Sequence, residues 1–163
     1  EGILLRPKRG IFHTPVLFEN QTMQVALPWG PEQRASRREG YVDATTGEIL
    51  WSTLHEDNCN GREFCHAGIS QVVTVIGDLV VGGSMDGILR AYSIQDGRVL
   101  WELDTTKDEF PSSTENKAYG GSCGGGAGPI ALDGLLLLSA GYGLYGHMPG
   151  NLLLALEVPQ NAK

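Results

Sequence analysis

Cysteine, aromatic side chains and positive charge are all scarce in this sequence. Its three cysteines are too few for the disulfide framework of a small secreted domain. The formal net charge of −7 argues against a nucleic-acid-binding surface, which needs an excess of lysine and arginine, so we expect no nucleic-acid partner. No apolar run approaches the ~18 residues of a membrane-spanning helix, so we also expect no membrane span.

Glycine, in contrast, is abundant. The chain has 23 glycines among 163 residues, and they lie between short apolar runs rather than in low-complexity tracts. Short apolar segments separated by glycine-containing turns are typical of β-strands and hairpins. The composition therefore predicts an all-β protein.

A repeat with a period of fifty residues runs through the middle of the chain. The stretch "VDATTGEILW" at 42–51 is followed by "YSIQDGRVLW" at 92–101, so that Gly47 and Trp51 recur as Gly97 and Trp101. A period of this length with only β patterns inside it is typical of propeller blades and related repeat architectures. The alternative is a small β-sandwich whose repeats are accidental.

A second pattern repeats inside the first. The segments "VVTVIGDLVVGGS" (72–84) and "PIALDGLLLLSAG" (129–141) each contain two apolar runs around a Gly-Asp or Asp-Gly pair, and 15–27 is a looser copy. Such pairs favour tight hairpins. The continuous run Leu135–Leu138 predicts a strand that is buried on both faces.

These patterns define three blade-like units, at about 11–54, 66–104 and 127–158, in one domain over 1–163. The third unit lacks the final "GxxLW" strand of the other two. Because a propeller needs four or more blades to close around its axis, we expect about three blades of a larger ring. The remaining blades would then be partners on another chain or belong to a processed precursor.

The motifs of these units resemble those of one family. "GGSMDGILRAYSIQDGRVLWELDT" (82–105) resembles the blade motif of pyrroloquinoline-quinone (PQQ) dependent, or quinoprotein, alcohol dehydrogenases, and 43–51 matches the same repeat. The stretch 119–158 is similar to the C-terminal end of these propellers, most of all in polyvinyl-alcohol-dehydrogenase-like proteins. The resemblance implies a C-terminal portion of a secreted or periplasmic eight-bladed ring, with PQQ as cofactor and calcium in the full-length ring.

The resemblance also implies cofactor-binding residues. PQQ lies flat across the propeller axis in the family, beside a glycine-rich turn of the last blade that matches Gly141, Tyr142 and Gly143. Glycine lets the backbone approach a planar ligand, and a tyrosine stacks or donates a hydrogen bond. Gly120-Gly121-Ser122 is a second candidate, for a carboxylate of PQQ. The alternatives are a simple β-turn with a half-exposed tyrosine and an ordinary connection between blades.

Other polar and aromatic residues have structural interpretations. Arg90 lies among apolar neighbours, and we expect it to alternate outward into solvent, although a position facing the axis is open. Asp86 is expected to be a hairpin-turn residue. Trp51 and Trp101 are expected to pack between neighbouring blades, as the tryptophan closing each repeat does in the family.

The cysteines and one asparagine carry further expectations. Cys59 and Cys65 bracket the short loop "CNGREFC" and either form a disulfide or remain two thiols. Cys123 is left over, as a buried thiol or a link to another chain. Asn20-Gln21-Thr22 is an N-glycosylation sequon, meaningful in a eukaryotic secreted protein.

The sequence departs from the family in its catalytic parts. The catalytic aspartate and calcium ligands of the family have no equivalent here, vicinal cysteines are absent, and there is no C-x-x-C-H haem motif. Histidines show no ligand-like spacing, so no metal site is expected in this chain. We expect one part of a ring that oxidises an alcohol to an aldehyde or ketone when assembled, the chain alone being inactive. The alternative is a non-catalytic secreted propeller that binds a small-molecule ligand or a partner chain.

Overall fold

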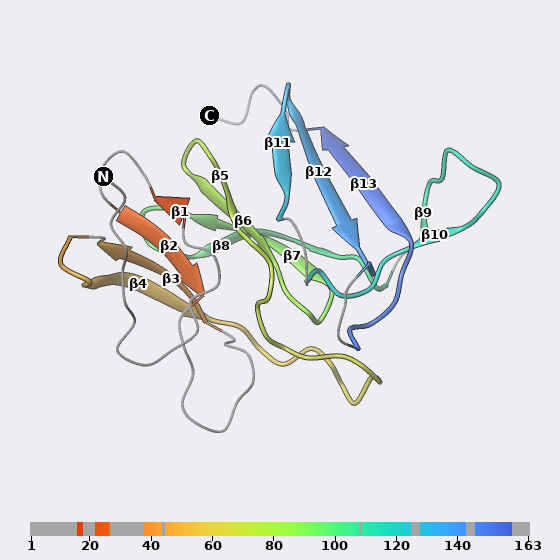
Figure 1. Ribbon diagram of the computed structural model, residues 1–163, viewed down its shortest axis with the longest axis horizontal. Helices are drawn as coiled ribbons and strands as arrows, with labels where there is room; N and C mark the ends of the chain where they lie inside the picture. Colours follow the sequence, from red (N-terminus) through yellow and green to blue (C-terminus); the bar gives the residue numbers. More distant parts are fainter. Residues whose placement is uncertain are drawn as a thin grey trace.

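The computed structural model describes residues 16–17, 22–26, 38–43, 45–107, 109–124, 128–142 and 146–157. All regular structure in these ranges is β-structure, as predicted (Figure 1). In the described part of the chain there is no helix with the length and apolar character needed to cross a membrane.

The strands form three antiparallel sheets and one short ribbon. The first sheet has the order β1 (Val16–Leu17), β2 (Thr22–Ala26), β3 (Arg38–Asp43), β4 (Ile49–Leu54). The second has the order β5 (Thr74–Ile76), β6 (Leu79–Gly83), β7 (Ile88–Ser93), β8 (Val99–Asp104). The third contains β11 (Ile130–Leu132), β12 (Leu135–Ala140) and β13 (Leu152–Glu157). The ribbon pairs β9 (Glu109–Phe110) with β10 (Ala118–Tyr119).

The fifty-residue repeat of the sequence is a repeat of geometry. In the β3–β4 hairpin the pairing register shifts directly after the pair Tyr41–Trp51. In the β7–β8 hairpin it shifts directly after the equivalent pair Ala91–Trp101. The hairpin turns also match, because Gly47 and Gly97 have φ angles of 76° and 71° and each donates its N–H four residues back. The two sheets are therefore built from equivalent outer hairpins.

The tight hairpin predicted at Asp133-Gly134 is present between β11 and β12. Asp133 has φ 48° and Gly134 has φ 78°, and both values lie in the left-handed region that a two-residue type I′ turn requires. Asp and Gly adopt this region more readily than other residues. The sequence pair thus fixes the register in which Leu132 faces Leu135.

The second sheet lies between the other two (Figure 1). Val80 pairs with Tyr92 and packs in a cluster with Tyr41 and Trp51 of the first sheet. On the opposite face, Val81 belongs to a cluster with side chains of β12 and β13. Since neighbouring residues of a strand point to opposite faces, β6 and β7 stabilise both interfaces at once. This face-to-face stacking is the arrangement of neighbouring propeller blades.

Trp51 connects the first sheet to the second. Its indole Nε1 donates a hydrogen bond of 2.8 Å to the carbonyl oxygen of Ile94, and a Cβ atom on Gly97 would lie 2.6 Å from Cδ2 of the indole. The ring stacks on Tyr41 and Tyr92 at centroid distances of 5.8 and 6.5 Å. The expected packing between blades is confirmed for Trp51, whereas Trp101 is 41% exposed in the described structure.

The prediction that Leu135–Leu138 is buried on both faces is wrong for this chain. Leu136 and Leu138 are buried against the second sheet, but Leu135 is 38% exposed. Leu135 pairs with Leu132, and both belong to the face of the third sheet that the described residues leave uncovered. Burial of that face requires a further layer.

Candidate functional site

Three connecting segments meet where β6, β8 and β12 end. They are the β6–β7 turn at 84–87, the segment 120–124 before the third sheet, and the two ends of the β12–β13 connection. The N–H of Cys123 donates to the carbonyl oxygen of Ser84, and the N–H of Gly141 donates to that of Ser122, each at 3.0 Å. The two predicted segments, Gly120–Ser122 and the turn that starts at Gly141, are therefore brought together by the fold.

Ser122 is the polar centre of this meeting point. Its hydroxyl donates to the carbonyl oxygen of Met85 at 2.6 Å and accepts from the N–H of Met148 at 3.0 Å. Its own N–H donates to the carbonyl oxygen of Met148 at 3.0 Å. The buried side chain thus joins the second sheet to the β12–β13 connection, and its hydroxyl is already engaged by the protein.

Glycine is required here because main chains cross at close range. A Cβ atom on Gly121 would lie 2.6 Å from the carbonyl oxygen of Pro149. One on Gly141, whose φ is 91°, would lie 2.6 Å from the carbonyl carbon of Gly150. The glycines of both segments are explained by backbone crossing. Tyr142 follows directly and is 60% exposed, whereas Gly143, like Asn20, lies outside the described residues. The assignment of Gly120, Gly121, Ser122, Gly141, Tyr142 and Gly143 to cofactor binding stays a prediction.

A charged cluster of the buried Arg90 and Asp86 and the half-exposed Glu102 lies beside this point. The expectation that Arg90 faces solvent is wrong: it is 3% exposed, with Nε 2.6 Å from Oε1 of Glu102 and an Nη atom 3.8 Å from Oδ2 of Asp86. Strand alternation directs Arg90 to the face that carries Tyr92, and the first sheet covers that face. Asp86 has the expected turn role, because its Oδ1 accepts from the N–H of Ile88 at 3.2 Å.

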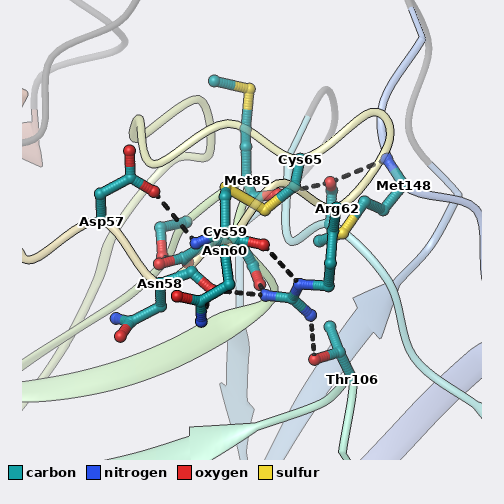
Figure 2. The surroundings of a disulfide bond; sticks show 12 residues. Asp57, Asn58, Cys59, Asn60, Arg62, Cys65, Met85, Thr106 and Met148 are labelled. Carbon is teal, nitrogen blue, oxygen red and sulfur yellow. Dashed lines mark hydrogen bonds between the residues drawn. A yellow bond between two sulfur atoms is a disulfide. The ribbon is translucent and has the colours of Figure 1, made fainter.

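The disulfide between Cys59 and Cys65 is present, with a sulfur–sulfur distance of 2.09 Å. It closes a loop in the connection from the first sheet to the second (Figure 2). Cys123 is a buried thiol rather than a link to another chain, and burial raises the pKa of its thiol to about 12. A thiol with this pKa is inert at neutral pH.

Two residues of this loop region were not singled out from the sequence. The guanidinium of Arg62 donates to the carbonyl oxygens of Asn58, Cys59 and Asp86, and to Oγ1 of Thr106 (Figure 2). Phe64 has a φ of 59° and is 50% exposed. Their only sign in the sequence was the position of both between two closely spaced cysteines.

His147 lies in the β12–β13 connection. Its Nδ1 is buried and has no hydrogen-bond partner among the described residues. Partial burial, together with the neighbouring His66, lowers the pKa of His147 below its usual value. The described residues contain no group of three or more histidine, cysteine or carboxylate side chains placed to hold a metal ion.

Comparison with known proteins decides the relationship. The chain is 38% identical over 103 residues to polyvinylalcohol dehydrogenase of Pseudomonas sp, and 33% identical over 104 residues to that of Sphingopyxis sp. strain 113P3. These matches cover 58% and 62% of this chain and 16% of each relative. The chain is homologous to part of the quinoprotein alcohol dehydrogenases.

The structure agrees with this homology. The quinohemoprotein alcohol dehydrogenase from Comamonas testosteroni matches with a TM-score of 0.56 and 23% identity, over 80% of this chain and 17% of that one. The fold is that of a quinoprotein propeller, of which this chain forms a part. No protein-family model matches the chain. It spans about a sixth of the length of the two polyvinylalcohol dehydrogenases.

Proposed function

We propose that this chain is the C-terminal part, in one propeller domain, of a PQQ-dependent alcohol-dehydrogenase-like protein, which oxidises an alcohol to an aldehyde or ketone when its ring is complete. The observation that carries the proposal is the homology to two polyvinylalcohol dehydrogenases over more than a hundred residues. The convergence of Gly120–Ser122 with Gly141 at one end of the stacked sheets supports it. In this account the chain supplies one wall of the cofactor site.

The fit of the described residues to PQQ is partial. The exposed ring of Tyr142 offers an aromatic face beside a backbone crossing that admits no side chain at Gly141. The hydroxyl of Ser122, in contrast, has its donor and one acceptor position engaged. We therefore assign the planar contact to Tyr142, and we place the residues that bind the charged groups of the cofactor, and calcium, in the remaining blades. When bound, PQQ would supply the hydride acceptor, and the protein would contribute its position and electrostatics.

The third sheet supports a partnership with further blades. Its outer face carries the exposed side chains of Ile130, Leu132 and Leu153. It has three strands where the first two sheets have four, so no described strand pairs with the free edge of β13. Since exposed apolar faces and sheet edges favour association, we propose that remaining blades of the ring cover both.

The disulfide supports a secreted or periplasmic location. Disulfides persist in oxidising compartments and are rare in the cytosol, and Cys59–Cys65 is bridged in this structure.

One observation favours the second candidate, a non-catalytic quinoprotein-like propeller that binds a small ligand. The Ser122 hydroxyl is engaged by main-chain groups of the protein itself. In that case the end of the sheets near Tyr142 binds a small molecule other than PQQ.

The test compares Tyr142→Ala with Tyr142→Phe in the intact protein. Because Phe keeps the aromatic face, we expect it to retain bound quinone and dye-linked alcohol oxidation, whereas Ala loses most of both. Leu100→Ala, an exposed apolar position on β8, is the control. Wild-type protein that releases a small molecule other than PQQ and oxidises no alcohol selects the second candidate.

A further inference from the structure

Phe64 has an unusual backbone conformation for its residue type. Its φ of 59° lies in the left-handed region, which a bulky side chain rarely adopts. Its side chain is 50% exposed in the described structure, so packing against the described residues does not explain the conformation. Residues held in such conformations cluster at binding sites, where the surrounding structure over-determines them.

The disulfide and several hydrogen bonds around Phe64 constrain the backbone of its loop. The Cys59–Cys65 disulfide closes the loop around it, and Asn60 and Gly61 have φ angles of 50° and 75°. Arg62 then fixes this loop to two other segments. It donates a hydrogen bond of 2.5 Å to Oγ1 of Thr106 (Figure 2) and one of 3.2 Å to the carbonyl oxygen of Asp86. The loop is thereby held against the β6–β7 turn and against the end of β8.

The fold places Phe64 next to the candidate site. A Cβ atom on Gly146 would lie 3.9 Å from Cδ1 of Phe64, and Gly146 belongs to the same connection as Tyr142 and Met148. Met148 in turn bonds to Ser122 at the crossing of the two predicted segments. An exposed aromatic ring held by its loop therefore lies beside Gly146, in the connection that also carries Tyr142 of the proposed cofactor wall.

We propose that Phe64 contacts the carbon chain of the alcohol substrate and determines chain-length specificity, with Arg62 as its positioning residue. This rests on the proposed function. The phenyl ring offers no hydrogen-bond donor for the carboxylates of a quinone. The reacting hydroxyl of an alcohol must point to the quinone, which leaves its hydrocarbon part for an apolar surface beside it. Phe64 provides that surface.

The experiment uses the intact quinone-loaded protein with ethanol and 1-hexanol as substrates. Phe64→Ala is expected to raise KM for 1-hexanol about tenfold relative to KM for ethanol, the size of effect that apolar contacts give. Its kcat and quinone content are expected to stay at the wild-type level, as those of the control Leu100→Ala do. Phe64→Gly relieves the backbone and removes the ring, so it should show the same change in the KM ratio.

Three results overturn the inference. They are an unchanged KM ratio in both variants, an equal rise in KM for both alcohols, and loss of quinone, which would make Phe64 a cofactor contact. If Phe64→Ala does not fold, Phe64→Leu replaces it. A smaller rise in the KM ratio then supports the inference, and an unchanged ratio overturns it.

A failure of the proposed function is recognised separately. It would appear as wild-type protein without quinone or turnover. Binding of 1-hexanol is then followed by saturation-transfer NMR of its methylene protons. Loss of transfer in Phe64→Ala but not in Leu100→Ala supports the contact, and equal transfer in all three proteins overturns it.

Discussion

The hydroxyl of Ser122 donates a 2.6 Å hydrogen bond to the carbonyl oxygen of Met85 across the boundary between the second and third sheets. It accepts another from the N–H of Met148. Both partners are main-chain groups, and Ser122 is buried, so no solvent replaces them. This small network joins the segment Gly120–Ser122 to the β6–β7 turn and to the β12–β13 connection.

Ser122→Ala is expected to lower the free energy of unfolding by about 1–3 kcal/mol, because it leaves two main-chain groups without a partner. Chemical denaturation of the intact protein measures this. The matched control is Ser112→Ala, since Ser112 is exposed and its hydroxyl bonds to Thr114, two residues away. Unchanged stability together with loss of quinone would show that Ser122 acts on the cofactor instead.

Two substitutions of Trp51 are expected to lower the free energy of unfolding by different amounts. Trp51→Ala removes a buried indole that stacks on two tyrosines, and we expect a loss of about 3–5 kcal/mol in the free energy of unfolding. Trp51→Phe keeps an aromatic ring and loses mainly the hydrogen bond to Ile94, so about 1–2 kcal/mol is expected. Equal losses in thermal or chemical denaturation would contradict the contribution of ring burial and stacking described above.

The three cysteines are expected to differ in reactivity. Alkylation of the native protein at pH 8, followed by peptide mapping, should modify none of them, because two are bridged and the thiol of Cys123 is buried with a raised pKa. Denaturant alone should expose Cys123, and denaturant with reductant should expose all three. Rapid labelling of Cys123 in the native protein would contradict its burial.

His147 is expected to destabilise the folded state in acid. The pKa of its folded form is lowered, so the unfolded chain binds its proton first, and stability falls as the pH drops through the unfolded pKa of about 6.5. Denaturation at pH 7 and pH 5 should show a larger loss for wild type than for His147→Gln. An identical loss in both proteins would place the effect elsewhere.

The strand pattern and the hairpins could be predicted from the sequence because they depend on local chemistry. Asp133-Gly134 selects its own turn, and the pairs Gly47/Trp51 and Gly97/Trp101 mark equivalent hairpins. The short loop between Cys59 and Cys65 left two alternatives open, a disulfide and two free thiols, and the disulfide is present.

The predictions that were wrong concern which layer, if any, covers one face of a strand. Strand alternation shows that Arg90 points away from Leu89, but whether solvent or a neighbouring sheet covers that face depends on how the sheets stack. For Leu135 the prediction was wrong in the opposite direction. Its apolar neighbours predicted burial on both faces, but the described residues leave its face exposed. Arg62 and Phe64 were missed because their contacts join segments more than twenty residues apart.

Native mass spectrometry of the protein as isolated tests the central claim most directly, with a denaturing run to identify what is released. The account predicts a species well above 17.5 kDa in which this chain is part of a complete ring, with release of a small molecule of PQQ mass. A stable 17.5 kDa monomer with nothing bound would contradict it.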